Sequence, residues 1–199
     1  LITHTLETAL ELRTNSLTNM MKKPTAQLRM IHYPENEIRC RDVASHTMMG
    51  AHTDYEFFTL LYQTMPGLQT VNVVGDWVDV PPIEDTLVMN VGDMAEVISG
   101  GRYRSNPHRV LNNGKERFSM PFFAAFDYNT TIYPMVSNIN SNANANNVYA
   151  SINAGEHLLK HVTLDFSYLR ERKALANPNL HFAKMVNNPF FKGKSPWIN

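Results

Sequence analysis

Short runs of apolar and polar residues, separated by turn residues, fill the middle of the chain. The runs are rich in β-branched and aromatic side chains, a composition that favours strands. Turn sequences such as Pro66-Gly67 and Asn113-Gly114 lie between them. Strands are therefore predicted over residues 28–33, 57–62, 68–73, 77–80, 86–91, 108–111 and 117–126. Many short strands with regular turns indicate a mainly β protein, either a sandwich or a jelly roll.

Helical spacing flanks this region on both sides. Apolar side chains recur at roughly helical intervals over residues 5–22, which predicts a helix near the N-terminus. A short helix is predicted at 93–99 with Asp93 as its N-cap, and a longer one at 153–173 starts from a capping sequence. Residues 137–147 are almost entirely Asn, Ser and Ala, a composition that predicts a surface loop.

The composition limits the classes of protein to which the chain can belong. Its 199 residues are 43% apolar and 18% charged, which suits one globular domain. The 18 basic and 18 acidic residues balance, so charge favours neither nucleic acid nor an anionic membrane as a partner. No run has the length of a membrane span, and no signal peptide is recognised. Cys40 is the only cysteine, which excludes an internal disulfide and favours a reducing, cytoplasmic location.

A pattern of metal-ligating residue types begins at His52-Thr53-Asp54. Alternate side chains of a strand share a face, so His52 and Asp54 on a strand would offer a nitrogen and a carboxylate oxygen together. A third ligand must come from elsewhere, and His108 is a candidate because it stands where a loop enters a predicted strand. Two histidines and a carboxylate leave open positions for an organic acid and dioxygen, as non-haem iron(II) oxygenases require.

Other interpretations of the histidines stay open at this point. A His-x-Asp pair also occurs by chance, and a single histidine such as His108 also occurs on ordinary surfaces. His157 and His161 are four residues apart on a predicted helix, a spacing that can bind zinc, but no third ligand accompanies them. These two side chains are therefore predicted to be solvated.

Arg117 and Ser119 form a candidate pair for binding a carboxylate. On a strand they would share one face, with Phe118 on the other. A planar guanidinium holds a carboxylate through two hydrogen bonds, and the hydroxyl adds another. The pair could thus hold the far carboxylate of a dicarboxylic acid whose near end chelates a metal. The alternative is an exposed Arg and Ser on an edge strand.

The order of short motifs along the chain carries a resemblance to a known family. In order, the motifs are Leu28-Arg29-Met30-Ile31-His32-Tyr33-Pro34, Gly50-Ala51-His52-Thr53-Asp54, Pro66-Gly67-Leu68-Gln69, Asn90-Val91-Gly92-Asp93, Asn106-Pro107-His108-Arg109-Val110 and Arg117-Phe118-Ser119-Met120-Pro121-Phe122-Phe123. Over about residues 25–130 the series resembles the iron(II)/2-oxoglutarate-dependent dioxygenases of the isopenicillin N synthase-like family.

The resemblance implies a fold, a cofactor and a set of site residues. The fold would be a double-stranded β-helix, that is, a cupin-like jelly roll, with flanking N-terminal and C-terminal helices. The cofactor would be Fe(II), with 2-oxoglutarate as cosubstrate and dioxygen as oxidant. The implied metal ligands are His52, Asp54 and His108, and the implied cosubstrate residues are Arg117, Ser119 and Tyr33.

The chain departs from the family pattern in two places. Many plant members carry Asn two residues before the tyrosine, where this chain has Ile31, so a contact with the metal-bound end of the cosubstrate is lost or supplied otherwise. Family members have a substantial N-terminal region before Tyr33, which this chain is expected to lack. Residues 1–199 are expected to form a single catalytic domain with its core over about 25–130.

The implied activity couples oxidative decarboxylation of 2-oxoglutarate to hydroxylation or a related oxidation of a small organic substrate. Two alternatives stay open: an oxidase of the isopenicillin N synthase type that needs no 2-oxoglutarate, and a jelly-roll binding module without catalysis. Four aromatic residues near the motifs are candidates for the substrate pocket, with core packing as the alternative: Tyr55, Phe57, Phe123 and Phe126. Neither the substrate nor the oligomeric state follows from the sequence.

Overall fold

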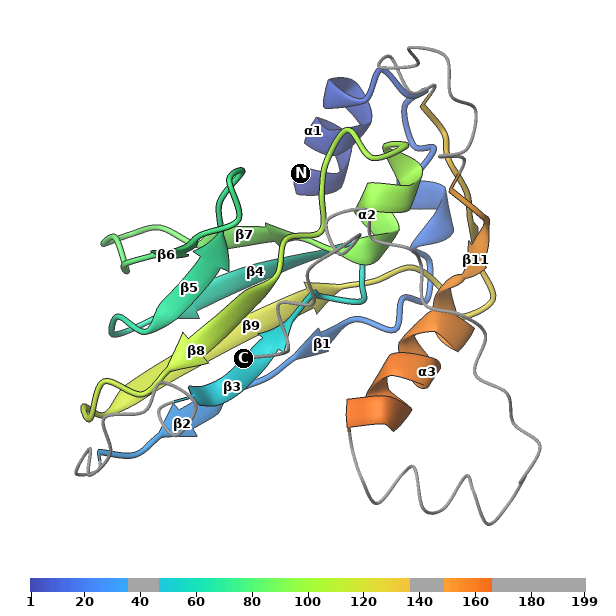
Figure 1. The fold of residues 1–199 in the computed structure, drawn as a ribbon. Coiled ribbons are helices and arrows are strands. Elements are labelled where there is room, and N and C mark those ends of the chain that lie inside the picture. Colours follow the sequence, from blue (N-terminus) through green and yellow to red (C-terminus); the bar gives the residue numbers. More distant parts are fainter. Residues whose placement is uncertain (36–46, 137–148, 166–199) are drawn as a thin grey trace. The chain divides into compact units, whose positions relative to one another are not determined.

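The computed structural model describes residues 1–35, 47–136 and 149–165, which form mainly antiparallel strands with a few helices (Figure 1). The chain divides into two compact units. The sheet unit comprises Ala26–Glu96 and Tyr103–Ala125, and the helical unit comprises Leu1–Thr25, Val97–Arg102 and Phe126–Asn199. No helix in the described part of the chain is long and apolar enough to cross a membrane.

Two antiparallel sheets make up the sheet unit. The larger has the order β1 (Gln27–Leu28), β9 (Arg117–Ala124), β4 (Phe58–Gln63), β7 (Val88–Val91), and β2 (Ile31–Tyr33) also pairs with β9. The smaller has the order β3 (Thr47–His52), β8 (His108–Leu111), β5 (Leu68–Val71), β6 (Trp77–Asp79). Tyr33 and Leu61 of the larger sheet pack with Leu68 and Val110 of the smaller, so the two sheets enclose one apolar core.

Strand β9 shows how the sequence pattern places side chains on the two faces of the larger sheet. Burial alternates along the strand, as expected for a sheet with one face toward the core. Arg117, Ser119 and Pro121 are buried, whereas the intervening Phe118 and Met120 are exposed. Over residues 117–122 the polar side chains of β9 therefore point inward and the large apolar ones point outward, the reverse of the usual arrangement.

The outer face of the larger sheet is apolar across four strands. Cross-strand pairing places Leu28 of β1, Phe122 of β9, Leu60 of β4 and Met89 of β7 in one row. In the next row Met120 of β9 pairs with Tyr62 of β4. Phe118, Met120 and Phe122 are each 39% exposed, which is a large contiguous apolar surface for a folded protein in water.

The helical unit contains the helices α1 (Ile2–Ala9), η1 (Thr18–Met20), which is a 3-10 helix, and α3 (Ala154–Asp165). It also contains two short antiparallel strands, β10 (Thr131–Ile132) and β11 (Ile152–Asn153). The predicted cap of α3 is confirmed, because the Asn153 side-chain oxygen accepts a hydrogen bond from the Glu156 N–H at 3.0 Å. A short helix, α2 (Asp93–Ile98), spans the boundary between the units. The predicted loop at 137–147 and the end of the predicted C-terminal helix lie outside the described residues.

The prediction of one helix over residues 5–22 is wrong, because α1 ends at Ala9. Beyond it the chain turns back, and Glu11 has a φ of 56° in the left-handed region. The cause is Glu7, a buried carboxylate that accepts hydrogen bonds of 2.8–3.0 Å from the backbone N–H groups of Asn15, Leu17 and Thr18. These three bonds satisfy N–H groups that a continued helix would have used, so the turn replaces the helix.

Replacing Glu7 with glutamine is expected to destabilise the fold at neutral pH. Burial by itself would raise the pKa of Glu7, but the backbone donors and His4 outweigh it and lower the pKa from 4.5 to about 2. The carboxylate therefore stabilises the fold above pH 4.5, and this contribution is lost as the pH falls from 4.5 toward 2. We expect Glu7→Gln to lower the free energy of unfolding by about 2 kcal/mol at pH 7.

Urea denaturation of the two proteins at pH 7 and at about pH 2.5 measures this difference, which should shrink at the lower pH. Equal free energies of unfolding at pH 7 would show that the carboxylate does not hold the turn. A Glu11→Gln variant, which changes a carboxyl in the same segment that is exposed, is the matched control.

Candidate metal centre and cosubstrate site

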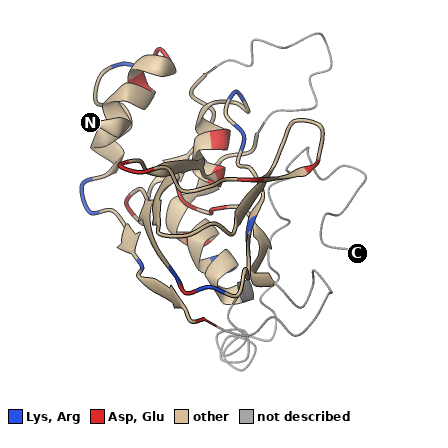
Figure 2. Cartoon of the chain, turned by 90° about the vertical axis from the view of Figure 1, so that its left-hand side faces the viewer, with Lys and Arg blue, Asp and Glu red and all other residues tan. Residues whose placement is uncertain are grey.

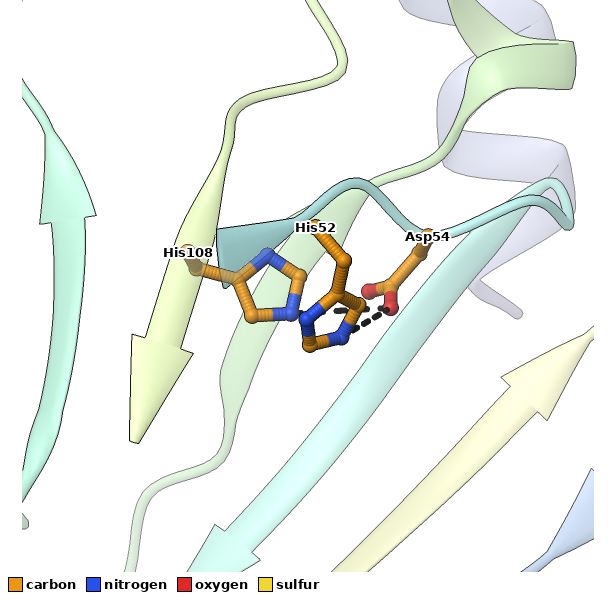
Figure 3. Close-up of side chains that lie close together, drawn as sticks. All are labelled: His52, Asp54 and His108. Carbon is orange, nitrogen blue, oxygen red and sulfur yellow. Dashed lines mark ion pairs between the residues drawn. The ribbon is translucent and has the colours of Figure 1, made fainter. Parts of the chain in front are cut away.

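His52, Asp54 and His108 converge within the sheet unit (Figure 3). His52 is the last residue of β3 and is the cross-strand partner of His108, the first residue of β8. The Nε2 atoms of His52 and His108 lie 3.9 and 3.5 Å from Asp54 Oδ1. One nitrogen or oxygen atom of each side chain lies within 4.8 Å of the others. Three such atoms facing one point can coordinate a divalent metal ion from one side.

The loop after β3, and not the strand itself, positions Asp54. Strand β3 ends at His52, so Asp54 is not part of the strand. The expectation that His52 and Asp54 share one face of a strand is therefore wrong. The Asp54 carbonyl oxygen instead accepts a hydrogen bond of 2.9 Å from the Asp93 N–H, at the start of α2. This close approach requires glycine at position 92, since a Cβ there would overlap the carbonyl of Glu56. The sequence Gly92-Asp93 thus fixes the ligand loop.

Backbone carbonyls hold both histidines in the form that binds metal. The His52 Nδ1–H donates to Gly50 O at 2.8 Å, and the His108 Nδ1–H donates to Asn106 O at 3.2 Å. Because carbonyls only accept, each Nε2 keeps its lone pair for the centre of the site. Burial lowers the pKa of His108; the Asp54 carboxylate opposes this effect and His52 adds to it. The imidazole therefore favours its neutral form, which is the form a metal requires.

The Asp54 carboxylate fits a bound cation. Asp54 is buried, and its Oδ2 has no hydrogen-bond partner among the described residues. A buried carboxylate oxygen without a donor costs free energy, which a metal ion would recover. A second carboxyl, Glu56, is also buried, and burial with the nearby Asp54 charge raises its pKa to about 7. The two histidines and the carboxylate form the ligand set of non-haem iron(II) sites.

The residues predicted to bind the cosubstrate are buried together on the larger sheet. At Arg117 and Ser119, β9 pairs with β2, and Ser119 also pairs with β4. The alternative of an exposed pair on an edge strand is therefore excluded. Tyr33 is the cross-strand partner of Arg117, and the Arg117 Cζ lies 5.0 Å from the centre of the Tyr33 ring. Arg117 Nη1 is buried with no hydrogen-bond partner among the described residues. A carboxylate is the ligand that such a guanidinium lacks.

Ile31, which stands where many family members have Asn, is the cross-strand partner of Ser119. Its side chain packs against the shared apolar core that contains Tyr33, Leu61, Leu68 and Val110. The described structure thus places an apolar group at this position, and the Ile31 side chain can donate no hydrogen bond to a cosubstrate.

The two α3 histidines and the four aromatic pocket candidates differ in how deeply they are buried. His157 and His161 were expected to be solvated, but each is 7% exposed and their rings are 4.5 Å apart on α3, so that expectation is wrong. Side chains four residues apart share a helix face, and this face of α3 is the buried one. Of the pocket candidates, Phe57 and Phe126 are fully buried, whereas Tyr55 and Phe123 are half-buried.

Two buried polar residues, Gln63 and Glu56, were missed at the sequence level. Gln63 ends β4, and its amide contacts Arg117. A usable signal existed, because alternation along Thr59, Leu61 and Gln63 gives Gln63 the same inward face as Leu61. No sequence signal marks Glu56 as buried, since it lies in the irregular segment between β3 and β4, where the strand period does not apply.

Two sheets around a shared core, with two histidines and a carboxylate at one point, are typical of non-haem iron(II) oxygenases. Residues 24–125 match the 2OG-Fe(II) oxygenase superfamily, and the chain belongs to this superfamily. The family resemblance inferred from the motifs is therefore confirmed. Members of this superfamily use Fe(II), 2-oxoglutarate and dioxygen.

Curated relatives agree with this assignment. The homoarginine-6-hydroxylase 2-ODD-C23 of Glycine max is 35% identical over 153 residues, which cover 70% of this chain and 43% of the relative. The 2-oxoglutarate-Fe(II) type oxidoreductase hxnY of Emericella nidulans is 43% identical over 101 residues, which cover 49% of this chain and 29% of the relative. The chain thus spans less than half the length of these two relatives.

Solved structures confirm the predicted double-stranded β-helix. A full-length protein of Neurospora crassa, crystallised with alpha-KG and thymine, has a TM-score of 0.69 and 26% identity, with 80% of this chain and 50% of that chain covered. The rice dioxygenase for auxin oxidation has a TM-score of 0.63 over 82% of this chain and 53% of its own. At 22% identity this second likeness supports the fold alone.

Proposed function

We propose that this chain carries the catalytic centre of an enzyme that couples decarboxylation of 2-oxoglutarate to oxidation of a small organic molecule. One observation carries the proposal: the His52, Asp54 and His108 cluster occurs in the same sheet unit as the buried, incompletely bonded Arg117. Such a unit suits a ligand that chelates a metal with one end and presents a carboxylate at the other. 2-Oxoglutarate has this form.

Each group of the site has a role in this proposal. His52, Asp54 and His108 hold the metal, while Arg117 and Ser119 bind the distal carboxylate of 2-oxoglutarate and Tyr33 covers the guanidinium. When bound, Fe(II) supplies the oxidising chemistry, in which one atom of dioxygen enters succinate as carbon dioxide leaves and the other enters the substrate. The chain itself orients the two carboxylate-binding groups and keeps water from them, because Arg117 and Ser119 are each 2% exposed.

The proposed substrate is a small molecule. The name of the Glycine max relative refers to homoarginine, and the Neurospora crassa protein was crystallised with thymine, so compounds of this size are the first to test. Tyr55 and Phe123 are the better pocket candidates, because they are only half-buried. Acidic and basic residues are scattered along the described chain and do not gather in one segment (Figure 2), so nucleic acid and membranes are not proposed as partners. The single cysteine fits a cytoplasmic location.

The test is a decarboxylation assay with the purified protein. With Fe(II), dioxygen and 2-oxoglutarate labelled at the 1-carbon, labelled carbon dioxide and succinate should form in equal amounts. A chelator should stop the reaction, and added Fe(II) should restore it. In parallel, calorimetry should detect 2-oxoglutarate binding in the presence of Mn(II). Absence of both binding and turnover would overturn the proposal.

The same two measurements separate the alternatives. An oxidase of the isopenicillin N synthase type would bind Fe(II) but would neither bind nor decarboxylate 2-oxoglutarate. A jelly-roll module without catalysis would bind no divalent metal through His52 and Asp54. The unsatisfied Arg117 Nη1 supports binding of a carboxylate such as that of 2-oxoglutarate, and it argues only weakly against the oxidase, because isopenicillin N synthase also carries an Arg-x-Ser pair.

A further inference from the structure

The environment of Arg117 contains no carboxylate among its described partners. Its Nε–H donates to the Met65 carbonyl oxygen at 3.2 Å, and its Nη2–H donates to Gln63 Oε1 at 3.0 Å. Both acceptors are neutral, and the third neighbour is the ring of Tyr33. Burial lowers the pKa of Arg117, yet a guanidinium stays charged in proteins. The positive charge is therefore oriented by the fold without being neutralised by it.

Gln63 is held so that its oxygen faces the guanidinium. Its Nε2–H donates to the Val80 carbonyl oxygen at 2.9 Å, on the opposite side of the amide from Arg117. Because a carbonyl only accepts and a guanidinium only donates, one orientation of the amide satisfies both contacts. The side chain is 6% exposed, and Gln63 is also the cross-strand partner of Ser119. It thus lies next to both groups assigned to the distal carboxylate.

We propose that Gln63 is a positioning residue for the distal carboxylate of the cosubstrate, an inference that rests on the proposed function. Its amide fixes the Arg117 fork in place while leaving the positive charge for the ligand. Glutamate, which has nearly the same shape, would form an internal ion pair and neutralise that charge. It would also lose the hydrogen bond to Val80 O, because a carboxylate cannot donate. The choice of amide over acid at position 63 therefore decides whether the site can bind an anion.

The test compares two α-keto acids on the Gln63→Glu variant. 2-Oxoglutarate has a distal carboxylate, whereas 2-oxobutanoate has the same chelating end and lacks it. Calorimetry with Mn(II), in the absence of turnover, gives the dissociation constant of each. For 2-oxoglutarate we expect the dissociation constant to rise by about 50-fold or more. The new carboxylate neutralises Arg117, which is equivalent for the ligand to losing its partner in a buried charge pair. For 2-oxobutanoate we expect a change of less than about threefold, because its metal-binding end is not affected.

The chain offers a matched control in the second Arg–Gln pair. Arg109 donates from Nε to Gln69 Oε1 at 2.9 Å, whereas Arg117 donates to Gln63 Oε1 from Nη2. Gln69 and Arg109 are on β5 and β8, and Arg109 lies over the Trp77 ring. Gln69→Glu makes the same amide-to-acid change outside the proposed site, at an amide that donates to Asp79 Oδ1 at 2.9 Å instead of to a backbone carbonyl. It should leave both dissociation constants within about twofold of the wild-type values.

The outcomes separate this inference from the proposed function. Wild-type protein that binds neither keto acid would contradict the proposed function itself. The positioning role would be overturned if the wild-type protein binds 2-oxoglutarate and folded Gln63→Glu binds it with the same affinity. It would also be overturned if Gln63→Glu lost affinity for both keto acids equally. If Gln63→Glu does not fold, Gln63→Met takes its place, because it removes the hydrogen bonds without adding charge. That variant should weaken binding of 2-oxoglutarate about tenfold and binding of 2-oxobutanoate by less than about threefold. Equal effects on the two ligands would overturn the positioning role of Gln63.

Discussion

Asp54→Ala is expected to abolish tight binding of Fe(II) and, with it, turnover of 2-oxoglutarate. Asp54 provides the only carboxylate among the three converging side chains, and its Oδ2 has no other partner in the described structure. Without it, two neutral imidazoles remain, and neither geometry nor charge favours a hard divalent cation. We expect at least about a 100-fold loss of Fe(II) affinity, measured by metal analysis after gel filtration and by calorimetry.

Asp76→Ala is the control for this variant, because Asp76 lies in the turn between β5 and β6 and is exposed. It should keep the metal content and the turnover of the wild-type protein. Circular dichroism establishes that Asp54→Ala remains folded, which is expected since removing a buried carboxylate also removes its desolvation cost. Stoichiometric iron in folded Asp54→Ala would exclude Asp54 as a ligand.

The second large effect is expected for Arg117→Met. Methionine fills most of the same space and cannot bind a carboxylate, so the KM for 2-oxoglutarate should rise by about 100-fold or more. Because the metal ligands are unchanged, Fe(II) binding should stay the same. The fold should also persist, since the variant replaces a buried charge that has no carboxylate partner among the described residues. Steady-state decarboxylation at varied 2-oxoglutarate concentrations measures the effect.

Arg109→Met serves as the comparison for Arg117→Met. Arg109 belongs to β8 and stacks on Trp77 at 4.2 Å, so its loss removes a cation–π contact without touching the proposed carboxylate site. The KM for 2-oxoglutarate should stay within about twofold of the wild-type value. If the two variants raised KM equally, a specific role for Arg117 would be untenable.

Sequence alternation predicted the strands that carry most of the site. Strand β8 has the predicted bounds, and β9 begins at Arg117 as expected, because alternating polar and apolar residues that follow turn sequences indicate a strand. The shared face of Arg117 and Ser119 followed from the same period. The convergence of His52 with His108 could not be obtained in this way, since it depends on pairing between strands far apart in the chain.

The sequence predictions that failed have physical causes that the local sequence does not show. Strand β3 was not among the predicted runs, because Thr47–His52 contains glycine and methionines and becomes a strand only by pairing with β8. The helix over 5–22 ended early because the Glu7 side chain competed for backbone donors. His157 was placed in solvent since helical spacing shows which side chains share a face but not which face is covered.

In concentrated solution, the exposed apolar side chains of β9 are expected to make the protein molecules attract one another. When two molecules meet there, water leaves Phe118, Met120 and Phe122, and each square ångström of apolar surface removed contributes about 25 cal/mol to their attraction. The osmotic second virial coefficient is therefore expected to be negative, because the 18 basic and 18 acidic residues balance and leave no net repulsion to oppose this attraction. Sulfate should lower the solubility further, and a mild non-ionic detergent that covers these side chains should raise it.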